Sequence, residues 1–336
     1  MDELWNKLQT KGIDKNLTIQ KLKEINSVYP VMLSKYLKEE ILQHDIPGVY
    51  KQFIPDHREL DDADGVGAFF ADEKNITETM VQKYPNRCII YLTSQCFANC
   101  RHCSRKENWI HRKAYSRMLF DRAYLAILER SYIEEVILTG GDVLTIPVEE
   151  IAYMLDKLNS LEHLRVIRLG TRAFTSNPDA ITSDFCEVLE KNKSVVVCTQ
   201  FNHPDEFSAQ TEAAIAKVQK TGTVILNQSV LLKGINDDFA TMKELLAKCA
   251  SNRVIPYYLF HCFKVKGVQC YRTDVQAGID LINKLVGTIG GWWIPRYTLI
   301  PHITGVKVPV CHNGIIKQDA DTLFVQDFMG RNLKYE

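Results

Sequence analysis

Short apolar runs alternate with amphipathic stretches from residue 86 onward, and this alternation predicts the fold. Six runs have the length and composition of buried strands: 88–93, 135–139, 165–169, 194–199, 223–227 and 254–260. Between them, apolar residues recur at helical spacing in stretches such as 118–130, 149–158, 207–220 and 241–250. Strands that alternate with helices form parallel sheets through right-handed crossovers. We therefore predict an α/β fold with a partial (β/α)6 barrel over 86–290.

The segments on either side of this repeat have a different pattern. Residues 1–85 place apolar residues at mixed helical spacing, interrupted by Pro30, Pro47 and Pro55, which predicts a mainly helical N-terminal region. Residues 291–336 remain as a short C-terminal segment. No apolar run approaches the length of a membrane span, and the charged N-terminus lacks the apolar core of a signal peptide. We therefore expect a cytoplasmic protein that does not bind membranes.

Composition narrows the class of protein further. The chain has 336 residues, of which 46% are hydrophobic, and this is ample for a buried core. Lysine plus arginine equals aspartate plus glutamate at 41 each, so there is no basic excess to indicate a nucleic-acid partner. Ten cysteines in a chain of this length do not make a disulfide scaffold, and we expect most of them to be reduced.

Polar residues recur directly after each predicted strand. In β/α barrels the chemistry lies at the C-terminal ends of the strands, so these residues are the candidate active face. They are Cys96 to Cys103 after the first run, Gly140-Gly141-Asp142 after the second, Gly170-Thr171-Arg172 after the third, Gln200 to Pro204 after the fourth, Asn227-Gln228-Ser229 after the fifth, and His261-Cys262 after the sixth.

The most specific of these motifs is the one that follows the first strand. Cys96, Cys100 and Cys103 are separated by three residues and then by two. A four-iron, four-sulfur cube normally takes four cysteines, so three would leave one iron open to a further ligand. Two alternatives remain: three reduced core cysteines, or a zinc knuckle in which His102 supplies the fourth ligand.

This cysteine spacing resembles the signature of radical S-adenosylmethionine (radical SAM) enzymes. In that superfamily the open iron binds the amino and carboxylate groups of S-adenosylmethionine, which is then split to a 5′-deoxyadenosyl radical. Gly140-Gly141-Asp142 by itself is typical of a turn. After the second strand of such a barrel it resembles the superfamily's Gly-Gly-Asp/Glu motif, whose backbone approaches the ligand closely and whose acidic residue holds the ligand's amino group.

Several longer sequence motifs resemble those of the lysine 2,3-aminomutase family, over about residues 70–310. They are Lys-Tyr-Pro-Asn-Arg at 83–87, Arg-His-Cys-Ser-Arg at 101–105, Gln-Phe-Asn-His-Pro-Asp-Glu at 200–206 and Leu-Asn-Gln-Ser-Val-Leu-Leu-Lys-Gly-Ile-Asn-Asp at 226–237. The resemblance implies that His203 and Gln228 bind S-adenosylmethionine. A single histidine would otherwise be interpreted as an ordinary structural residue.

The resemblance also implies a second cofactor, pyridoxal 5′-phosphate. Lys307, in Gly-Val-Lys-Val-Pro-Val at 305–310, would be its Schiff-base lysine, although only one glycine closely precedes it where the family usually has several. Such a lysine must lose its proton easily, which a partly desolvated pocket favours. Tyr84 and Arg87 would hold the ring and phosphate, and Arg105 would pair with the substrate α-carboxylate.

One part of the match fails, and it concerns the substrate. The lysine enzyme recognises the distal ammonium of lysine with two carboxylates, and Phe263 and Ile300 stand at those positions. An ammonium buried there would be unpaired, so free L-lysine is disfavoured. Lys264, Lys266 and His302 lie close in sequence and would suit an acidic side chain. A neutral or aromatic side chain is also compatible.

We therefore expect a radical SAM, pyridoxal-phosphate-dependent 2,3-aminomutase that moves an α-amino group to Cβ of a free amino acid other than lysine, as a small-molecule substrate. An electron donor such as flavodoxin or ferredoxin is implied, and a homo-oligomer is compatible with the sequence. Two alternatives stay open. One is an enzyme that modifies a lysine of a translation factor, and the other is a non-catalytic iron–sulfur redox sensor or binding protein.

Overall fold

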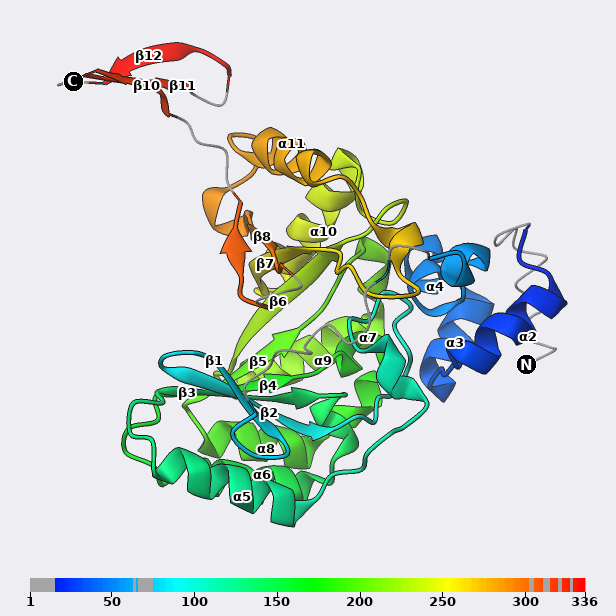
Figure 1. The fold of residues 1–336 in the computed structure, drawn as a ribbon, viewed down its shortest axis with the longest axis vertical. Helices are drawn as coiled ribbons and strands as arrows, with labels where there is room; N and C mark the ends of the chain where they lie inside the picture. Colours follow the sequence, from blue (N-terminus) through cyan, green and yellow to red (C-terminus); the bar gives the residue numbers. More distant parts are fainter. Residues whose placement is uncertain are drawn as a thin grey trace.

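A nine-stranded sheet forms the centre of the protein, with strands in the sequential order β1 to β9 (Figure 1). The computed structural model describes residues 16–62, 65, 75–301, 305–310, 315–319, 322–326 and 329–335. The strands are β1 Met80–Tyr84, β2 Arg87–Thr93, β3 Glu135–Gly140, β4 Val166–Gly170, β5 Val195–Thr199, β6 Val224–Leu231, β7 Ile255–His261, β8 Arg296–Leu299 and β9 Val308–Pro309. Strands β2 to β8 run parallel, and β1 and β9 pair antiparallel at the two edges.

The six predicted strands are confirmed as β2 to β7, and a β/α unit follows from each of them. Strand β6 continues to Leu231 because the ladder with β7 resumes beyond an irregularity at Asn227 and Gln228, where the sequence suggested an end. The sequence did not predict β1, β8 or β9, nor the strands of the C-terminal segment described below. Strand β1 lies at the end of the segment predicted to be helical, and β8 adds a seventh parallel strand beyond the six units. Both are short and gain their hydrogen bonds from a neighbouring strand, which local periodicity does not encode.

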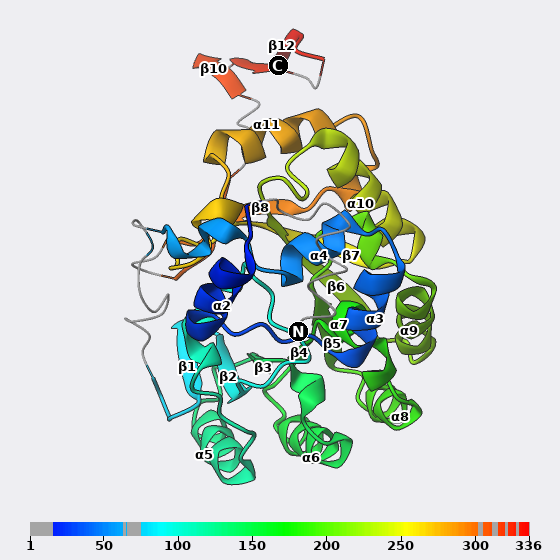
Figure 2. The ribbon, with the colours of Figure 1, turned by 90° about the vertical axis from the view of Figure 1, so that its right-hand side faces the viewer.

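The helices divide into two groups, one around the sheet and one at its inner side. The barrel helices are α5 Arg117–Leu128, α6 Val148–Asn159, α7 Ala173–Ser176, α8 Ser183–Lys191, α9 Ala209–Lys220, α10 Phe239–Ser251 and α11 Val275–Leu285. The N-terminal helices are α2 Ile19–Val28, α3 Lys35–Gln43 and α4 Pro47–Phe53. Figure 2 shows α5, α6, α8, α9 and α10 around the outside and the N-terminal helices in front of the sheet.

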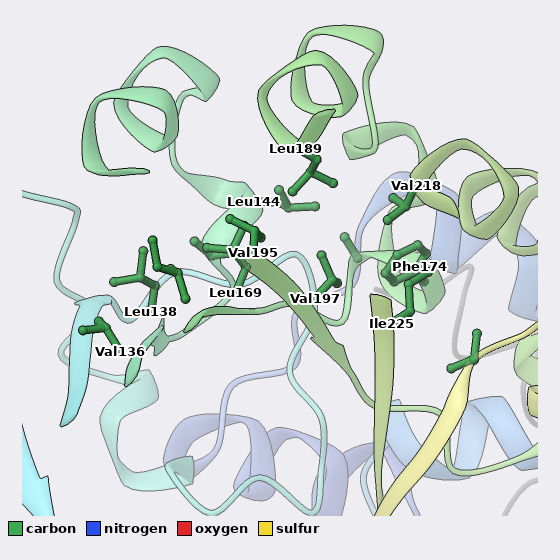
Figure 3. Close-up of a cluster of buried hydrophobic side chains, with 14 of the residues drawn as sticks. Val136, Leu138, Leu144, Leu169, Phe174, Leu189, Val195, Val197, Val218 and Ile225 are labelled. Carbon is green, nitrogen blue, oxygen red and sulfur yellow. The ribbon is translucent and has the colours of Figure 1, made fainter. Parts of the chain in front are cut away.

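Side chains alternate along the parallel strands, so that one face of the sheet packs against the outer helices and the other faces the interior of the barrel. Val136, Leu138, Leu169, Val195 and Val197 are fully buried against the outer helices (Figure 3). Each such side chain contributes on the order of 1.5–3 kcal/mol when it leaves water. Strand residues have a period of two, so the intervening positions face the interior of the barrel. This interior contains the charged and aromatic groups described below.

The N-terminal helices have a second apolar core, which they share with the loop that contains the three clustered cysteines. Its buried members include Ile25, Ile41 and Phe53 from the helices and Ala98 and Trp109 from the loop and the turn after it. Helices α2 and α3 begin at serine or threonine caps, whose hydroxyls accept backbone N–H bonds at the first turn. The N-terminal region is therefore packed onto the candidate site.

Beyond the barrel, β10 Ile315–Asp319, β11 Thr322–Gln326 and β12 Asn332–Tyr335 form a separate antiparallel sheet, which Figure 1 shows at one end of the molecule. Among the described residues, no helix has both the length and the apolar character needed to cross a lipid bilayer.

Candidate active site

The three predicted cluster cysteines lie on the loop that follows β2, at the C-terminal end of the first parallel strand. All three are free thiols and half-buried. Burial raises the pKa of Cys96 well above its usual value, and negative charge on Asp142, Cys103 and Cys100 acts in the same direction. Burial also raises the pKa of Cys103, with Cys100 as the next cause. The three sulfurs are therefore close enough for their charges to influence one another.

This donor set fits an iron–sulfur cluster better than a single metal ion. Within the part of the chain that the structure describes, no three His, Cys, Asp or Glu side chains converge as one bound ion requires. In a four-iron cube each thiolate binds a different iron, so three thiols need only reach three corners. Nε2 of His102 lies 3.3 Å from Gln200 Oε1 and 3.3 Å from Asn202 Nδ2, and burial lowers the pKa of this histidine to about 3.

Gly140 and Gly141 allow the end of β3 to pack against the start of the cysteine loop. Gly141 N–H donates to the Thr93 carbonyl at 2.6 Å, and Asp142 N–H donates to the Gln95 carbonyl at 2.7 Å. A Cβ on Gly140 would lie 2.3 Å from the Thr93 oxygen, and one on Gly141 would lie 2.0 Å from the Gln95 oxygen. The two glycines therefore let the backbone approach the cysteine loop closely; their predicted approach to a ligand stays a prediction.

Asp142 connects the loops that follow β3 and β4. Its buried carboxylate accepts hydrogen bonds from Leu144 N–H at 3.0 Å, the Thr171 hydroxyl at 2.7 Å and Arg172 N–H at 2.8 Å. Burial raises the pKa of this carboxyl group. A carboxylate has about four acceptor positions, so three are used and one remains for a ligand donor.

The structure places His203 and Gln228, the other two predicted S-adenosylmethionine residues, in different surroundings. His203 packs against helix α4, where a Cβ on Gly48 would lie 2.0 Å from its ring, and its Nδ1 accepts from Asp205 N–H at 3.1 Å. Gln228 lies on the inner face of β6 and hydrogen-bonds to Cys198 on β5. Gln228 is therefore in the barrel interior, and His203 is at the contact with the N-terminal helices.

Lys307 enters the barrel interior beside the other residues predicted to bind pyridoxal phosphate. The backbone N–H of Lys307 donates to the Tyr84 hydroxyl at 2.8 Å, and its side-chain Nζ lies 5.2 Å from the ring centre of Tyr258. Burial, followed by the positive charges of Arg168 and Arg87, lowers the pKa of Lys307 to about 8. The amine therefore loses its proton far more easily than a surface lysine, as an imine-forming lysine requires.

Arginine donors without partners lie near these groups. The guanidinium carbon of Arg87 is 3.8 Å from the ring centre of Tyr84, and that of Arg105 is 3.9 Å from the ring centre of Tyr91. Among the described residues, the buried Nε atoms of Arg87 and Arg168 and one terminal nitrogen of Arg105 have no hydrogen-bond acceptor. Buried donors of this kind are normally satisfied, so they fit an anionic ligand such as a phosphate or a carboxylate.

Phe263 and Ile300, the predicted substrate side-chain residues, pack against one apolar cluster. Its buried members are Val230, Leu232, Ile235, Phe260, Cys262, Val265, Val268 and Tyr271. His302 lies outside the described residues. Lys264 and Lys266 are exposed, so the expectation that they would pair with a buried acidic side chain receives no support from the structure. Alternation along the chain after β7 turns them to solvent while Val265 is buried.

Sequence reasoning missed the buried charges that hold the cysteine loop in place. Glu59, from the 3₁₀ turn His57–Leu60, forms ion pairs with Arg101 and Lys106, and all three side chains are fully buried. Burial would raise the pKa of Glu59, but Arg101 and then Lys106 reverse this and lower it. The only local signal was two basic residues in an otherwise buried cysteine loop, and nothing in the sequence marked Glu59 as their partner.

Comparisons with known proteins agree with this site. The chain is 31% identical over 318 residues to glutamate 2,3-aminomutase of Clostridioides difficile, covering 94% of this chain and 75% of the relative. It is 32% identical over 286 residues to L-lysine 2,3-aminomutase of Clostridium subterminale, covering 84% and 68% of the two chains. No family model matches the chain.

Among solved structures, SuiB of Streptococcus suis bound to S-adenosylmethionine aligns with a TM-score of 0.48 and 13% identity, over 66% of this chain and 51% of that one. The six β/α units and the cysteine loop after the first parallel strand form a partial barrel, and the relatives identify its class as that of the radical SAM aminomutases. Within that class, the chain belongs to the lysine 2,3-aminomutase family, whose members use a four-iron cluster, S-adenosylmethionine and pyridoxal phosphate.

Proposed function

We propose that this protein is a 2,3-aminomutase that moves the α-amino group of an amino acid other than free lysine to Cβ. One observation supports this most strongly. A lysine of lowered pKa and arginine donors without partners share the interior of the barrel whose rim carries the three-cysteine loop. Together they provide places for a phosphate, an imine-forming carbonyl and a carboxylate near one cluster.

The residues that would hold each group follow from these positions. Cys96, Cys100 and Cys103 would hold the cluster. Gly140, Gly141, Asp142 and Gln228 would surround S-adenosylmethionine, and Tyr84, Arg87 and Lys307 would hold pyridoxal phosphate; His203 lies instead at the contact with helix α4. When bound, the cluster and S-adenosylmethionine supply the radical that removes a hydrogen atom, and pyridoxal phosphate supplies the conjugated ring that carries the nitrogen.

Arg105 would orient the substrate by its α-carboxylate. Its backbone N–H contacts the Cys103 sulfur at 3.3 Å, so this arginine is fixed directly beside the cluster loop. Its guanidinium carbon lies 3.9 Å from the ring centre of Tyr91, and one buried N–H donor of the group has no protein acceptor among the described residues. A carboxylate bound there places the neighbouring Cα and Cβ close to the radical source, and such positioning is the main contribution of a protein to radical chemistry.

Lys307 would act as the amine that holds and releases the cofactor carbonyl. Its lowered pKa leaves a substantial neutral fraction near physiological pH. The aromatic rings of Tyr84, Tyr258 and Phe260 stand within 6.0 Å of its Nζ and exclude water from this amine. A protonated lysine can return a proton to the departing group, so one residue serves both directions of the exchange.

The side chain of the substrate is best assigned as uncharged. Phe263 and Ile300 pack on an apolar cluster, and the lysines nearby in sequence are exposed. An unpaired ammonium placed against these residues would cost a few kcal/mol, which is about a hundredfold or more in selectivity. We therefore propose an amino acid with a neutral or aromatic side chain as the substrate.

A substrate screen tests this proposal. The protein is reconstituted anaerobically with iron, sulfide, pyridoxal phosphate and S-adenosylmethionine and reduced with dithionite. The common amino acids are then assayed for β-amino product by mass spectrometry. We expect one or more neutral or aromatic substrates, with L-lysine at least about a hundredfold slower. Turnover of L-lysine equal to that of the best substrate would refute the assignment, and turnover of glutamate or aspartate alone would replace it with an acidic substrate.

A pair of variants tests the location of the side-chain site. Phe263→Asp with Ile300→Asp restores two carboxylates and is expected to improve L-lysine binding. Phe263→Asn with Ile300→Asn has similar size and polarity without charge and is the matched control. If both variants bind L-lysine equally, Phe263 and Ile300 do not contact the substrate side chain.

A further inference from the structure

Arg172, which follows strand β4, directs one guanidinium nitrogen at the sulfur of Cys100. The distance from Nη1 to Sγ is 2.8 Å. We infer that Arg172 is a positioning residue for the iron–sulfur cluster, fixing Cys100 and placing a charged hydrogen-bond donor at its sulfur. This inference rests on the proposed function, because it takes Cys100 as a cluster ligand.

The guanidinium is held from several sides, so its direction is fixed. Nε donates to the Gln200 carbonyl at 3.1 Å, and Nη2 donates to a Glu206 carboxylate oxygen at 3.1 Å and to the Gln52 side chain. The face of the group lies 4.7 Å from the ring centre of Phe53. A guanidinium held by several hydrogen bonds loses little further entropy when it donates to the sulfur of Cys100. It cannot turn away from this sulfur without breaking those hydrogen bonds.

The partners of Arg172 come from three distant parts of the chain, which are helix α4, the segment after β5 and the cysteine loop. Gln52 and Phe53 belong to helix α4, and Glu206 ends the 3₁₀ turn Pro204–Glu206 after β5. Glu206 is buried, and its carboxylate also accepts from Gln52 Nε2 at 2.9 Å and the Thr175 hydroxyl at 2.7 Å. The N-terminal helices therefore reach the cluster loop through this arginine.

The consequence for the cluster is electrostatic and local. Glu206 offsets the charge of Arg172 at long range, so what remains at Cys100 is a short, directed, charge-assisted hydrogen bond. Hydrogen bonds to cluster sulfurs and local net charge set the reduction potential of iron–sulfur centres. The reduced cluster carries one more negative charge, so a cationic donor at a ligand sulfur stabilises it relative to the oxidised cluster. Without Arg172, the cluster should accept an electron less readily.

A redox titration measures this effect without any turnover. Wild-type protein, Arg172→Gln and the charge-matched double variant Arg172→Gln with Glu206→Gln are reconstituted. Each is titrated with dithionite as one-electron donor and followed by the paramagnetic resonance signal of the reduced cluster. We expect the equilibrium constant for one-electron reduction to fall at least tenfold in both variants, a downward shift of about 59 mV or more.

Arg168→Gln is the control, because it removes another buried arginine, from strand β4, which directly precedes Arg172. Arg168 pairs with Glu135 and hydrogen-bonds to Cys198, and neither contact involves the cysteine loop. We expect its potential to match the wild type. An equal shift in Arg168→Gln would overturn the inference, because the effect would then follow total charge and not the contact with Cys100.

The outcomes separate this inference from the proposed function. If wild-type protein binds no cluster, the proposed function fails and the inference fails with it. If wild type binds the cluster and Arg172→Gln, at full iron content, has the same potential, only the inference fails. Should Arg172→Gln not retain a cluster, the double variant decides, since it leaves no unpaired buried charge. A wild-type potential in that variant would overturn the inference.

Discussion

The ammonium of Lys106 lies 2.7 Å from a carboxylate oxygen of Glu59, 47 residues earlier in the chain, and both side chains are fully buried. Arg101 pairs with the same carboxylate. The ion pairs therefore fasten the N-terminal region to the loop that contains the three clustered cysteines. Removing one partner of a buried pair leaves the other charge uncompensated, and this is the costly case.

Glu59→Ala should therefore destabilise the protein by about 3–5 kcal/mol. Chemical denaturation with the cluster absent measures this loss. Glu78→Ala is the control, because it removes an exposed ion pair with Arg122, and its midpoint should equal that of the wild type. The Arg101 and Lys106 charges lower the folded-state pKa of Glu59, so its stabilising effect is present at neutral pH and disappears as the pH falls through that pKa. Equal stability of Glu59→Ala and wild type would contradict the structural account.

Alanine at Cys96, Cys100 or Cys103 should abolish the cluster. With two thiolates left, the cube loses an iron ligand, and the iron and sulfide content after anaerobic reconstitution should fall to background. Cys186→Ala and Cys249→Ala are the controls. Cys249 is buried in the core on α10, and Cys186 lies on α8 and packs against the same core, so neither change should lower the iron content. Retention of a full cluster by Cys103→Ala would show that the loop is not its site.

The reaction of Lys307 with pyridoxal phosphate should follow its lowered pKa. Only the neutral amine attacks a carbonyl. The attachment rate should therefore rise about tenfold per pH unit below a pKa of about 8 and level off above it. Borohydride reduction and peptide mapping locate the adduct. Arg168→Gln removes the largest charge acting on Lys307, so the midpoint should move to higher pH. An adduct found instead on Lys264 or Lys266 would refute this assignment.

Gly141→Ala should loosen the cysteine loop. The new Cβ would lie 2.0 Å from the Gln95 carbonyl oxygen, so the backbone must shift, at a cost of about 1–3 kcal/mol. Thermal unfolding and cluster retention after reconstitution report this shift. Gly291→Ala is the matched control, because a Cβ there meets no atom within 4 Å. If the two variants unfold at the same temperature, the close approach of Gly141 to the loop does not contribute to stability.

The sequence by itself determined the six parallel strands, their order and the location of the cysteine loop. Each strand is an apolar run bounded by polar residues, and sequential β/α units admit few arrangements. The resemblance to a known family, and not the strand pattern, put Lys307, Arg105 and the roles of the glycine pair among the candidates.

Only the tertiary structure decided which charges lie together inside the protein. Glu59 pairs with Lys106 across 47 positions of the chain, and Arg172 contacts Cys100 across 72. The exposure of Lys264 depends on the direction in which the loop after β7 turns. Local patterning cannot report such contacts, because a charged residue has the same local sequence whether it faces water or a distant partner. The free energy that selects between these two states arises from the packing of the whole chain.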